Sequence, residues 1–183
     1  MIRKSALAGA SLCALLGTCP AFAAAGKLIG DPAAACANIA AYAQGDVKID
    51  SATLQQPSQL AVAERGPTPA ARITPANPAF CKALGHIEPR DKAAPPINFQ
   101  VNLPVEWNGR SLQYGGGGFN GVLITGLGLP PAHPYDRPSP LAQGFVTYGT
   151  DSGHQTKQGE PPQVFALNDE AFLNFAHVSY KRV

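Results

Sequence analysis

The stretch that decides the fold reads Ser111-Leu-Gln-Tyr-Gly-Gly-Gly-Gly-Phe-Asn-Gly121, a short half-apolar strand that runs directly into glycines. Glycine has no Cβ, so a glycine run can adopt positive φ and bring its backbone N–H groups close to a ligand. After a strand, many hydrolases use such a loop as one side of an oxyanion hole. The amides of Gly117 and Gly118 are the candidate donors. The alternative is a tight turn that only lets strand and loop pack closely.

A phosphate site is the weaker interpretation of the same glycines. The run continues Phe119-Asn120-Gly121 and lacks the Lys-Ser/Thr pair that completes a P-loop. The final glycine is also expected to fall one residue away from the G-x-G-x-x-G spacing, so the oxyanion-hole interpretation is preferred.

The first 23 residues have the pattern of a signal peptide. Arg3 and Lys4 give a basic start, Ala6–Leu16 is apolar, and Ala21-Phe-Ala23 is a cleavage signal. The apolar run is too short to span a bilayer. We expect cleavage after Ala23 and export to the periplasm or beyond. The alternative is lipid attachment at Cys19, which the bulky threonine before it disfavours.

Composition limits the partners of the remaining domain, residues 24–183. The whole chain has 14 basic and 12 acidic residues, and residues 1–23 hold two basic residues and no acid, so the mature charge is zero. No basic patch stands out, so neither nucleic acid nor an anionic membrane is an expected partner. A chain of about 160 residues is long enough to bury the core of one domain.

The cysteines indicate a cross-link. Cys36 and Cys81 are the pair that remains after cleavage. In an oxidising compartment an even pair is typical of a disulfide, which here would tie an N-terminal helix to a strand.

Alternation of apolar and polar residues predicts the strands. The clearest strand is Ile97–Leu103, and Phe80–Ile87 is another. Val47–Asp50 begins a third, and Phe145–Tyr148 is a buried fourth. Asn108-Gly109 is a hairpin signal, so Leu112–Tyr114 is expected to return antiparallel to Ile97–Leu103. Residues 63–78 carry four prolines and are expected to form a surface loop.

Caps predict the helices. Asp31-Pro32 opens a helix that Gly45 ends, and Ser139-Pro140 opens a short one that Gly144 ends. Asn168 caps a third helix, whose expected buried face is Phe172, Phe175, Ala176 and Ser179. Together the elements predict an α/β fold, the N-terminal part of a mixed sheet with an antiparallel hairpin at its start. Half of such a sheet would have an unpaired edge.

Two motifs about thirty residues apart, Gly115–Gly121 and Thr150–Gln155, resemble the tannase and feruloyl esterase family. The resemblance covers roughly residues 36–183 and includes three further segments: Phe80-Cys-Lys82, Trp107-Asn-Gly-Arg110 and Leu141-Ala-Gln-Gly-Phe145. It implies an α/β-hydrolase fold and a secreted Ser-His-Asp esterase that acts on aromatic carboxylic esters. In that family the nucleophile lies in a G-C-S-x-G turn beyond the last predicted helix, and the acid, base and calcium-binding lid come later. The resemblance therefore implies that this chain is truncated before the nucleophile elbow, is inactive alone and holds no cofactor or metal.

Asp151, Ser152 and His154 contain the residue types of a catalytic triad without its spacing. A nucleophile elbow needs glycine two residues before and two after the serine, and here those residues are Thr150 and His154. Triad members also converge from separate elements. We expect Asp151 and His154 to organise the loop by hydrogen bonds. The alternative is that they contact substrate beside Phe119, since loops at this sheet edge commonly line clefts.

The other histidines, His86, His133 and His177, are scattered, so we expect structural roles rather than metal binding. A function from another class stays open. The chain would then be a small exported protein that binds an aromatic or sugar ligand through the Gly115–Gly121 loop without catalysis.

Overall fold

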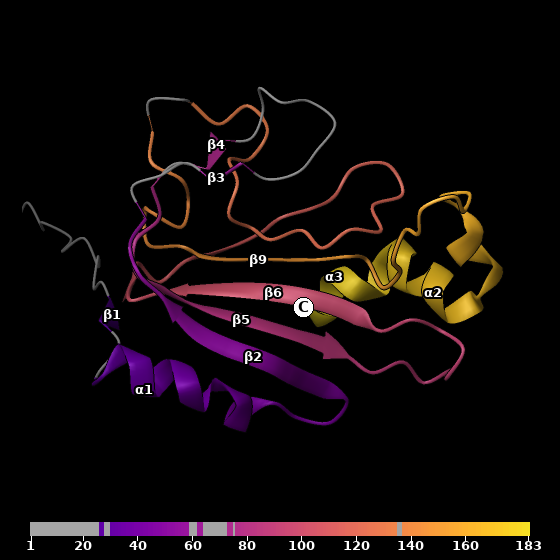
Figure 1. The fold of residues 1–183 in the computed structure, drawn as a ribbon, viewed down its shortest axis with the longest axis horizontal. Helices are drawn as coiled ribbons and strands as arrows, with labels where there is room; N and C mark the ends of the chain where they lie inside the picture. Colours follow the sequence, from indigo (N-terminus) through magenta and orange to yellow (C-terminus); the bar gives the residue numbers. More distant parts are fainter. Residues whose placement is uncertain (1–25, 28–29, 59–61, 64–72, 75, 135–136) are drawn as a thin grey trace, which may run out of the picture.

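A five-stranded mixed sheet forms the centre of the computed structural model, which describes residues 26–27, 30–58, 62–63, 73–74, 76–134 and 137–183 (Figure 1). The order across the sheet is β2-β5-β6-β9-β8. Neighbours are antiparallel from β2 to β9, whereas β9 and β8 are parallel. The strands are β2 Val47–Gln55, β5 Phe80–Ile87, β6 Ile97–Pro104, β9 Val146–Thr150 and β8 Ser111–Gln113. The predicted strands all exist, and so does the antiparallel start.

Two short ladders lie outside this sheet. β1, Gly26–Lys27, pairs with β7, Glu106–Trp107, and β3, Val62–Ala63, pairs with β4, Ile73–Thr74. Most of the loop expected at residues 63–78 lies outside the described residues. The signal peptide, its cleavage site and Cys19 also lie outside them.

The expected hairpin between β6 and β8 is wrong. β9 lies between the two strands: it pairs antiparallel with β6 and parallel with β8. The Asn108-Gly109 turn does form, because Gly109 has φ +82° and Arg110 N donates to Asn108 Oδ1 at 2.9 Å. However, Asn108 N donates to Gly144 O at 2.9 Å, and Val146 N donates to Arg110 O at 3.0 Å. The Asn-Gly turn reverses the chain only locally. β9, which comes later in the sequence, is the hydrogen-bonding neighbour of both β6 and β8.

The apolar face of the sheet carries the core. Ile87, Ile97 and Phe99 are buried together, and Val47, Ile49, Val101 and Val183 pack around them. Helix α1, Pro32–Ala37, continues as a 3-10 turn, Asn38–Tyr42, and lies along β2 (Figure 1). As expected, Asp31 caps α1 through its side chain. A disulfide between Cys36 and Cys81, with Cα atoms 5.5 Å apart, links this helix to β5.

The opposite face of the sheet is polar and lies under the long loop between β8 and β9. Asn102 is fully buried and donates to Thr125 O at 2.7 Å and to Thr147 Oγ1 at 3.0 Å. The helix expected at residues 139–144 is only one turn, in which Gln143 N donates to Ser139 O at 2.9 Å. Gly144, at φ +85°, ends the turn before a second can form.

The last helical region follows a 3-10 turn, Val164–Leu167, and begins where expected, with the Asn168 side chain capping Ala171 N at 2.9 Å. It runs as α2 Asp169–Leu173, a π turn Asn174–Val178 and α3 Ser179–Arg182. The expected buried face is partly wrong. Ala171, Asn174 and Ser179 are buried, whereas Phe172 and Ala176 are exposed. A π turn holds more residues per turn than an α-helix, so it shifts the face away from the 3.6-residue pattern.

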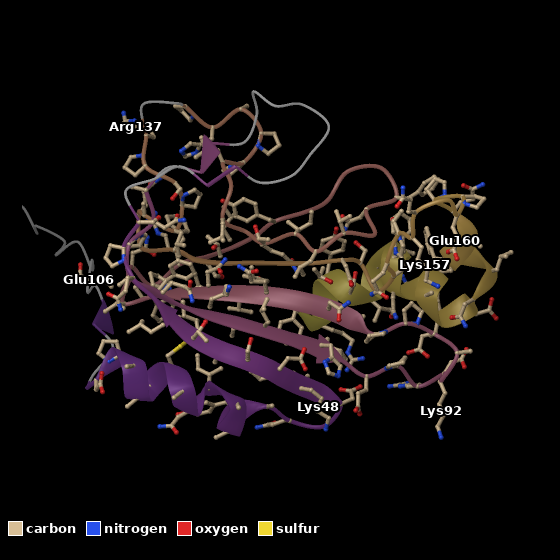
Figure 2. The ribbon with its side chains drawn as sticks, viewed as in Figure 1. Lys48, Lys92, Glu106, Arg137, Lys157 and Glu160 are labelled. Atoms are coloured by element: carbon tan, nitrogen blue, oxygen red, sulfur yellow. A yellow bond between two sulfur atoms is a disulfide. The ribbon has the colours of Figure 1, made fainter. Side chains whose placement is uncertain are left out.

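Charged side chains are spread around the molecule. Figure 2 shows residues of both signs at its edges and on different segments, among them Lys48, Lys92, Glu106, Arg137, Lys157 and Glu160. No helix in the described part of the chain is both long and apolar enough to cross a membrane.

Candidate functional site

Two loops meet at the carboxyl end of the parallel strand pair. β8 leads into residues 115–121, here called the glycine loop, and β9 leads into residues 151–156, the β9 loop. Because β8 and β9 are parallel neighbours, both loops leave the same edge of the sheet. Thr156 N donates to Gly121 O at 2.8 Å, and Asn120 Nδ2 donates to Thr150 O at 3.2 Å. The two motifs found in the sequence therefore form one site.

The glycine loop leaves backbone donors unused. Asn120 N donates to Gly117 O at 2.9 Å and closes a tight turn, with Gly118 at φ +58°. Gly117 and Gly118 are both exposed, and their N–H groups donate to none of the residues that the structure describes. Two consecutive amides at the carboxyl edge of the sheet can therefore bind an external acceptor.

The surroundings of each glycine show which of them the fold requires. A Cβ on Gly116 would collide with the Asn120 side chain, and a Cβ on Gly121 would collide with Thr156 Oγ1. In contrast, Gly117 has no positive φ and no heavy atom within 4 Å of the Cβ position. The described chain needs glycine at 116 and 121, while the space over Gly117 is open.

The loop also bears on the phosphate interpretation. The expectation that the G-x-G-x-x-G spacing fails is wrong, because Gly116, Gly118 and Gly121 have that spacing. A phosphate site of that type needs a helix directly after the glycines, and the described residues between 121 and 138 contain none.

Asp151 holds the β9 loop together. Asp151 is 1% exposed, and its carboxylate accepts four hydrogen bonds at 2.6 to 3.1 Å, from Asn98 N, Asn98 Nδ2, Gly153 N and Gln155 Nε2. Burial raises the pKa of Asp151 above 3.8, although the four donors act in the opposite direction. All of its hydrogen-bonding capacity is used inside the protein.

His154 is buried among aromatic rings. It is 2% exposed, stacks on Phe165 with ring centroids 3.7 Å apart, and meets Phe175 edge-on at 5.6 Å. Neither ring nitrogen has a well-formed hydrogen bond to the described residues. Burial lowers the pKa of His154 below 6.5, while the Asp151 charge and the nearby carbonyls of Ser152 and Phe119 oppose this. The imidazole is therefore neutral near pH 7.

Ser152 does not form a triad with its neighbours. It is fully buried at φ +66°, and its Oγ accepts from Asn120 Nδ2 at 2.8 Å and lies 3.2 Å from Tyr180 OH. No hydrogen bond joins the Ser152 hydroxyl to the His154 ring. Ser152 is therefore part of the framework beneath the glycine loop.

Sequence reasoning missed Phe165 and Tyr180. Phe165 lies in a 3-10 turn without apolar periodicity, so the sequence carries no signal that it stacks on His154. Tyr180 follows Ser179, which was expected on a buried face, but its hydroxyl contacts depend on two distant loops. Phe119 stands over this group with 47% of its surface exposed, its ring centroid 6.1 Å from that of Phe165.

The other candidates do not add a second site. His86 Nδ1 pairs with an Asp50 carboxylate oxygen at 2.9 Å, and His133 Nε2 lies 3.1 Å from Pro138 O, while His177 is exposed. Within the described ranges no three metal-ligating side chains come together.

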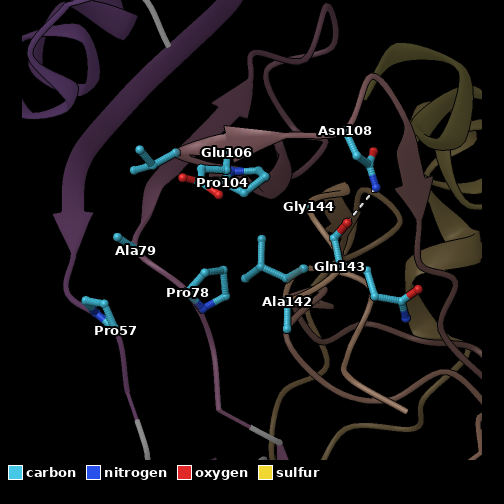
Figure 3. A pocket seen from close by; sticks show the side chains of 11 residues that line it. Pro57, Pro78, Ala79, Pro104, Glu106, Asn108, Ala142, Gln143 and Gly144 are labelled. Atoms are coloured by element: carbon cyan, nitrogen blue, oxygen red, sulfur yellow. Dashed lines mark hydrogen bonds between the residues drawn. The ribbon is translucent and has the colours of Figure 1, made fainter. Parts of the chain in front are cut away.

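A hollow of about 500 Å³ lies at the opposite edge of the sheet, beside Pro57, Pro78, Pro104 and Gly144 (Figure 3). It borders the end of β6 and the start of β9, away from the unused amides, and it lacks titratable groups apart from Glu106. The two loops are therefore the candidate functional site.

Solved structures share this fold. Feruloyl esterase B from Aspergillus oryzae matches with TM-score 0.55 and 22% identity, over 83% of this chain and 27% of that chain. A second Aspergillus oryzae esterase matches with TM-score 0.58 and 21% identity, over 83% and 28%. The five strands are therefore part of an α/β-hydrolase sheet.

Sequence comparison assigns the family. The model for tannase and feruloyl esterase matches residues 81–183. An uncharacterized esterase of Agrobacterium fabrum is 42% identical over 153 residues, 81% of this chain and 26% of the relative. A mono(2-hydroxyethyl) terephthalate hydrolase of Piscinibacter sakaiensis is 33% identical over 127 residues, 65% of this chain and 21% of the relative. The chain belongs to the tannase and feruloyl esterase family, and it spans about a quarter or less of these relatives.

Proposed function

We propose that this chain forms the oxyanion-stabilising side of a serine carboxylic-ester hydrolase site for aromatic acid esters. The observation that carries the proposal is the pair of exposed, unused amides at Gly117 and Gly118, at the carboxyl edge of an α/β-hydrolase sheet. When a nucleophile attacks an ester carbonyl, the oxygen gains negative charge, and preorganised N–H donors stabilise it. The open space over Gly117 leaves room for that oxygen.

The aromatic ring is the proposed specificity element. Phe119 follows the donors directly and exposes 47% of its surface, while Phe165 and Phe175 support its ring. An aryl group can pack against such a ring by offset or edge-to-face contact. One relative is named for a terephthalate ester and one structural neighbour as a feruloyl esterase, so an aromatic acid ester is the proposed substrate class. Asp151 and His154, both buried, would support the loop rather than touch the substrate.

The 183 residues do not supply the nucleophile. No serine in the chain has glycine both two residues before and two residues after it. Residues 24–183 are therefore proposed as the N-terminal portion of the hydrolase domain, with nucleophile, acid, base and any calcium-binding lid contributed by other sequence. We also propose export through a signal peptide, residues 1–23, on the pattern described above.

The test separates binding from turnover. We expect the purified chain to hydrolyse neither methyl gallate nor methyl ferulate above buffer, because it has no activated attacking group. Turnover by the purified chain would show that these residues hold a working site and would overturn the proposal, and Ser152→Gly would then show whether that turnover needs the Ser152 side chain. Glycine suits φ +66° at that position, so this substitution removes the side chain without straining the backbone.

Binding is tested by titrating gallate while recording amide NMR spectra. The signals of Gly117 and Gly118 should shift, and Gly117→Ala should weaken binding about tenfold, a loss of about 1.4 kcal/mol. Gly115→Ala is the matched control, since Gly115 also has open space and no positive φ. Equal losses in both variants would contradict the assignment of the donors.

A binding protein without catalysis is the second candidate, favoured by the coexistence of unused donors and no nucleophile in this chain. The DNA that follows the Val183 codon distinguishes the two. A G-C-S-x-G sequence within about a helix length, in frame or one frame shifted, supports the esterase. A genuine stop codon with unrelated sequence beyond it supports the binding protein.

A further inference from the structure

Three segments far apart in the sequence meet at the buried hydroxyl of Ser152. Asn120 Nδ2 donates to Ser152 Oγ at 2.8 Å from the glycine loop. Tyr180 OH lies 3.2 Å from the same Oγ and comes from α3. Ser152 itself is fully buried in the β9 loop. The hydroxyl group is thus a junction between both loops and the last helix.

The same tyrosine holds the backbone of the glycine loop. Gly116 N donates to Tyr180 OH at 3.3 Å. Gln113 Nε2, at the end of β8, donates to Tyr180 O at 3.1 Å and fixes the helix against the strand. The amide of Gly116 is therefore directed toward α3, whereas those of Gly117 and Gly118, which follow it, are left for an external acceptor.

The Asn120 side chain secures the other end of the turn. It bridges Ser152 Oγ and Thr150 O across the space beside Gly116, where a Cβ would collide with it. Asn120 and Ser152 both have positive φ, 55° and 66°. L residues adopt this region only at an energetic cost, and such conformations persist where surrounding contacts determine them. Here the Asn120–Ser152–Tyr180 hydrogen bonds are those contacts.

We propose that Tyr180 is a positioning residue for the oxyanion-hole donors: through Ser152 and Asn120 it orients the glycine loop so that the Gly117 and Gly118 amides point outward. The catalytic meaning of this assignment rests on the proposed function, whereas the orientation can be measured without it. Tyr180 itself does not touch the substrate. The last helix thereby sets the geometry of a site on the neighbouring loops.

The test compares Tyr180→Phe with Tyr42→Phe in the 183-residue chain. The first substitution removes only the hydroxyl, and the second does the same at a tyrosine that is 79% exposed. In Tyr180→Phe the Gly116 amide proton should move upfield and exchange at least fivefold faster, consistent with losing one hydrogen bond. The ¹H–¹⁵N NOE of Gly117 and Gly118 should fall, and gallate should bind about five- to tenfold more weakly. The amides of β6 should not change.

Ser152→Gly provides the second variant, because it removes the junction hydroxyl together with its Cβ and glycine accepts the backbone conformation. It should reproduce the changes at Gly117 and Gly118. The proposal is overturned if these signals do not change in Tyr180→Phe, or if every amide of the sheet changes in parallel. Weaker gallate binding with unchanged Gly117 and Gly118 dynamics would also overturn it, since Tyr180 would then contact the ligand directly. Absence of gallate binding in the unsubstituted chain would contradict the proposed function, and the Gly116 measurements would still decide the positioning role.

Discussion

The glycine loop and the β9 loop leave the same edge of the sheet, yet they use their polar groups in opposite ways. In the β9 loop, the Asp151 carboxylate accepts four internal hydrogen bonds and is almost completely buried. In the glycine loop, the Gly117 and Gly118 amides are exposed and have no acceptor among the described residues. A residue type found in catalytic triads is thus buried and hydrogen-bonded within the protein. The unused hydrogen-bond donors belong instead to the backbone of glycines, which have no side chain.

This difference follows from what each loop must satisfy. A buried carboxylate needs donors on its oxygens, because an unsatisfied buried charge is strongly destabilising. Exposed amides can be satisfied by water until a ligand replaces it. Under the proposed function, the side of the site that faces a ligand is therefore the one with unused hydrogen-bond donors, rather than the one with reactive residue types.

The largest expected effect comes from a change away from both loops. Replacing Cys36 and Cys81 together by alanine removes the constraint on a 45-residue separation and should lower the free energy of unfolding by about 4 kcal/mol. Urea unfolding measures this, and the amide signals of both loops should stay in place. Mass mapping without reductant should find one bridged peptide pair. Two readily alkylated thiols in exported protein would show that the Cys36–Cys81 disulfide does not form.

Asp151→Ala tests how much the Asp151 carboxylate stabilises the β9 loop. Removing the carboxylate takes away an acceptor of four hydrogen bonds from Asn98, Gly153 and Gln155 and leaves the Gly153 amide buried without a partner, so the free energy of unfolding should fall by about 3 kcal/mol. Asp169→Ala, at an exposed helix position, should cost less than about 1 kcal/mol. Similar losses in the two variants would mean that the Asp151 hydrogen bonds do not stabilise the loop.

A pair of alanine substitutions tests the glycine loop. Gly116→Ala should destabilise the protein by about 1–3 kcal/mol, because its Cβ would displace the Asn120 side chain. Gly117→Ala should change stability by less than about 0.5 kcal/mol, since its Cβ meets nothing within 4 Å. Thermal unfolding of both variants measures these two changes in stability. Equal destabilisation would remove the distinction between framework glycines and the ligand-facing glycine.

The smallest effect concerns pH. The pKa of His154 is lowered below 6.5 in the folded chain, so between that lowered value and 6.5 the unfolded chain binds more protons. Stability should therefore fall as pH decreases through this window. His154→Phe, which keeps a ring beside Phe165, should remove this part of the pH dependence in urea titrations at several pH values. His177→Gln, at an exposed residue, should leave it, and an unchanged profile in His154→Phe would show that another group titrates.

Short-range patterns predicted the individual elements well. Alternation located β5 and β6, and the caps at Asp31 and Asn168 located the starts of two helices. The hairpin failed because the turn at Asn108-Gly109 does not determine which strand lies beside β8. The buried face of the last helix failed in part because one π turn changed its periodicity.

By itself, the amino-acid sequence determined the strands, the caps, the cysteine pair and the position of the glycine run, since each depends on residues within a few positions or on chemistry alone. Only the tertiary structure decided that β9 separates β6 from β8, that Asp151 is satisfied internally, and that Tyr180 reaches Gly116. The physical reason is how far apart in the sequence the interacting residues lie. A cap or an alternation pattern is a local preference, whereas the junction at Ser152 requires hydrogen bonds between residues 32 and 28 positions away, and chain reversal brings these groups together only when the sheet forms.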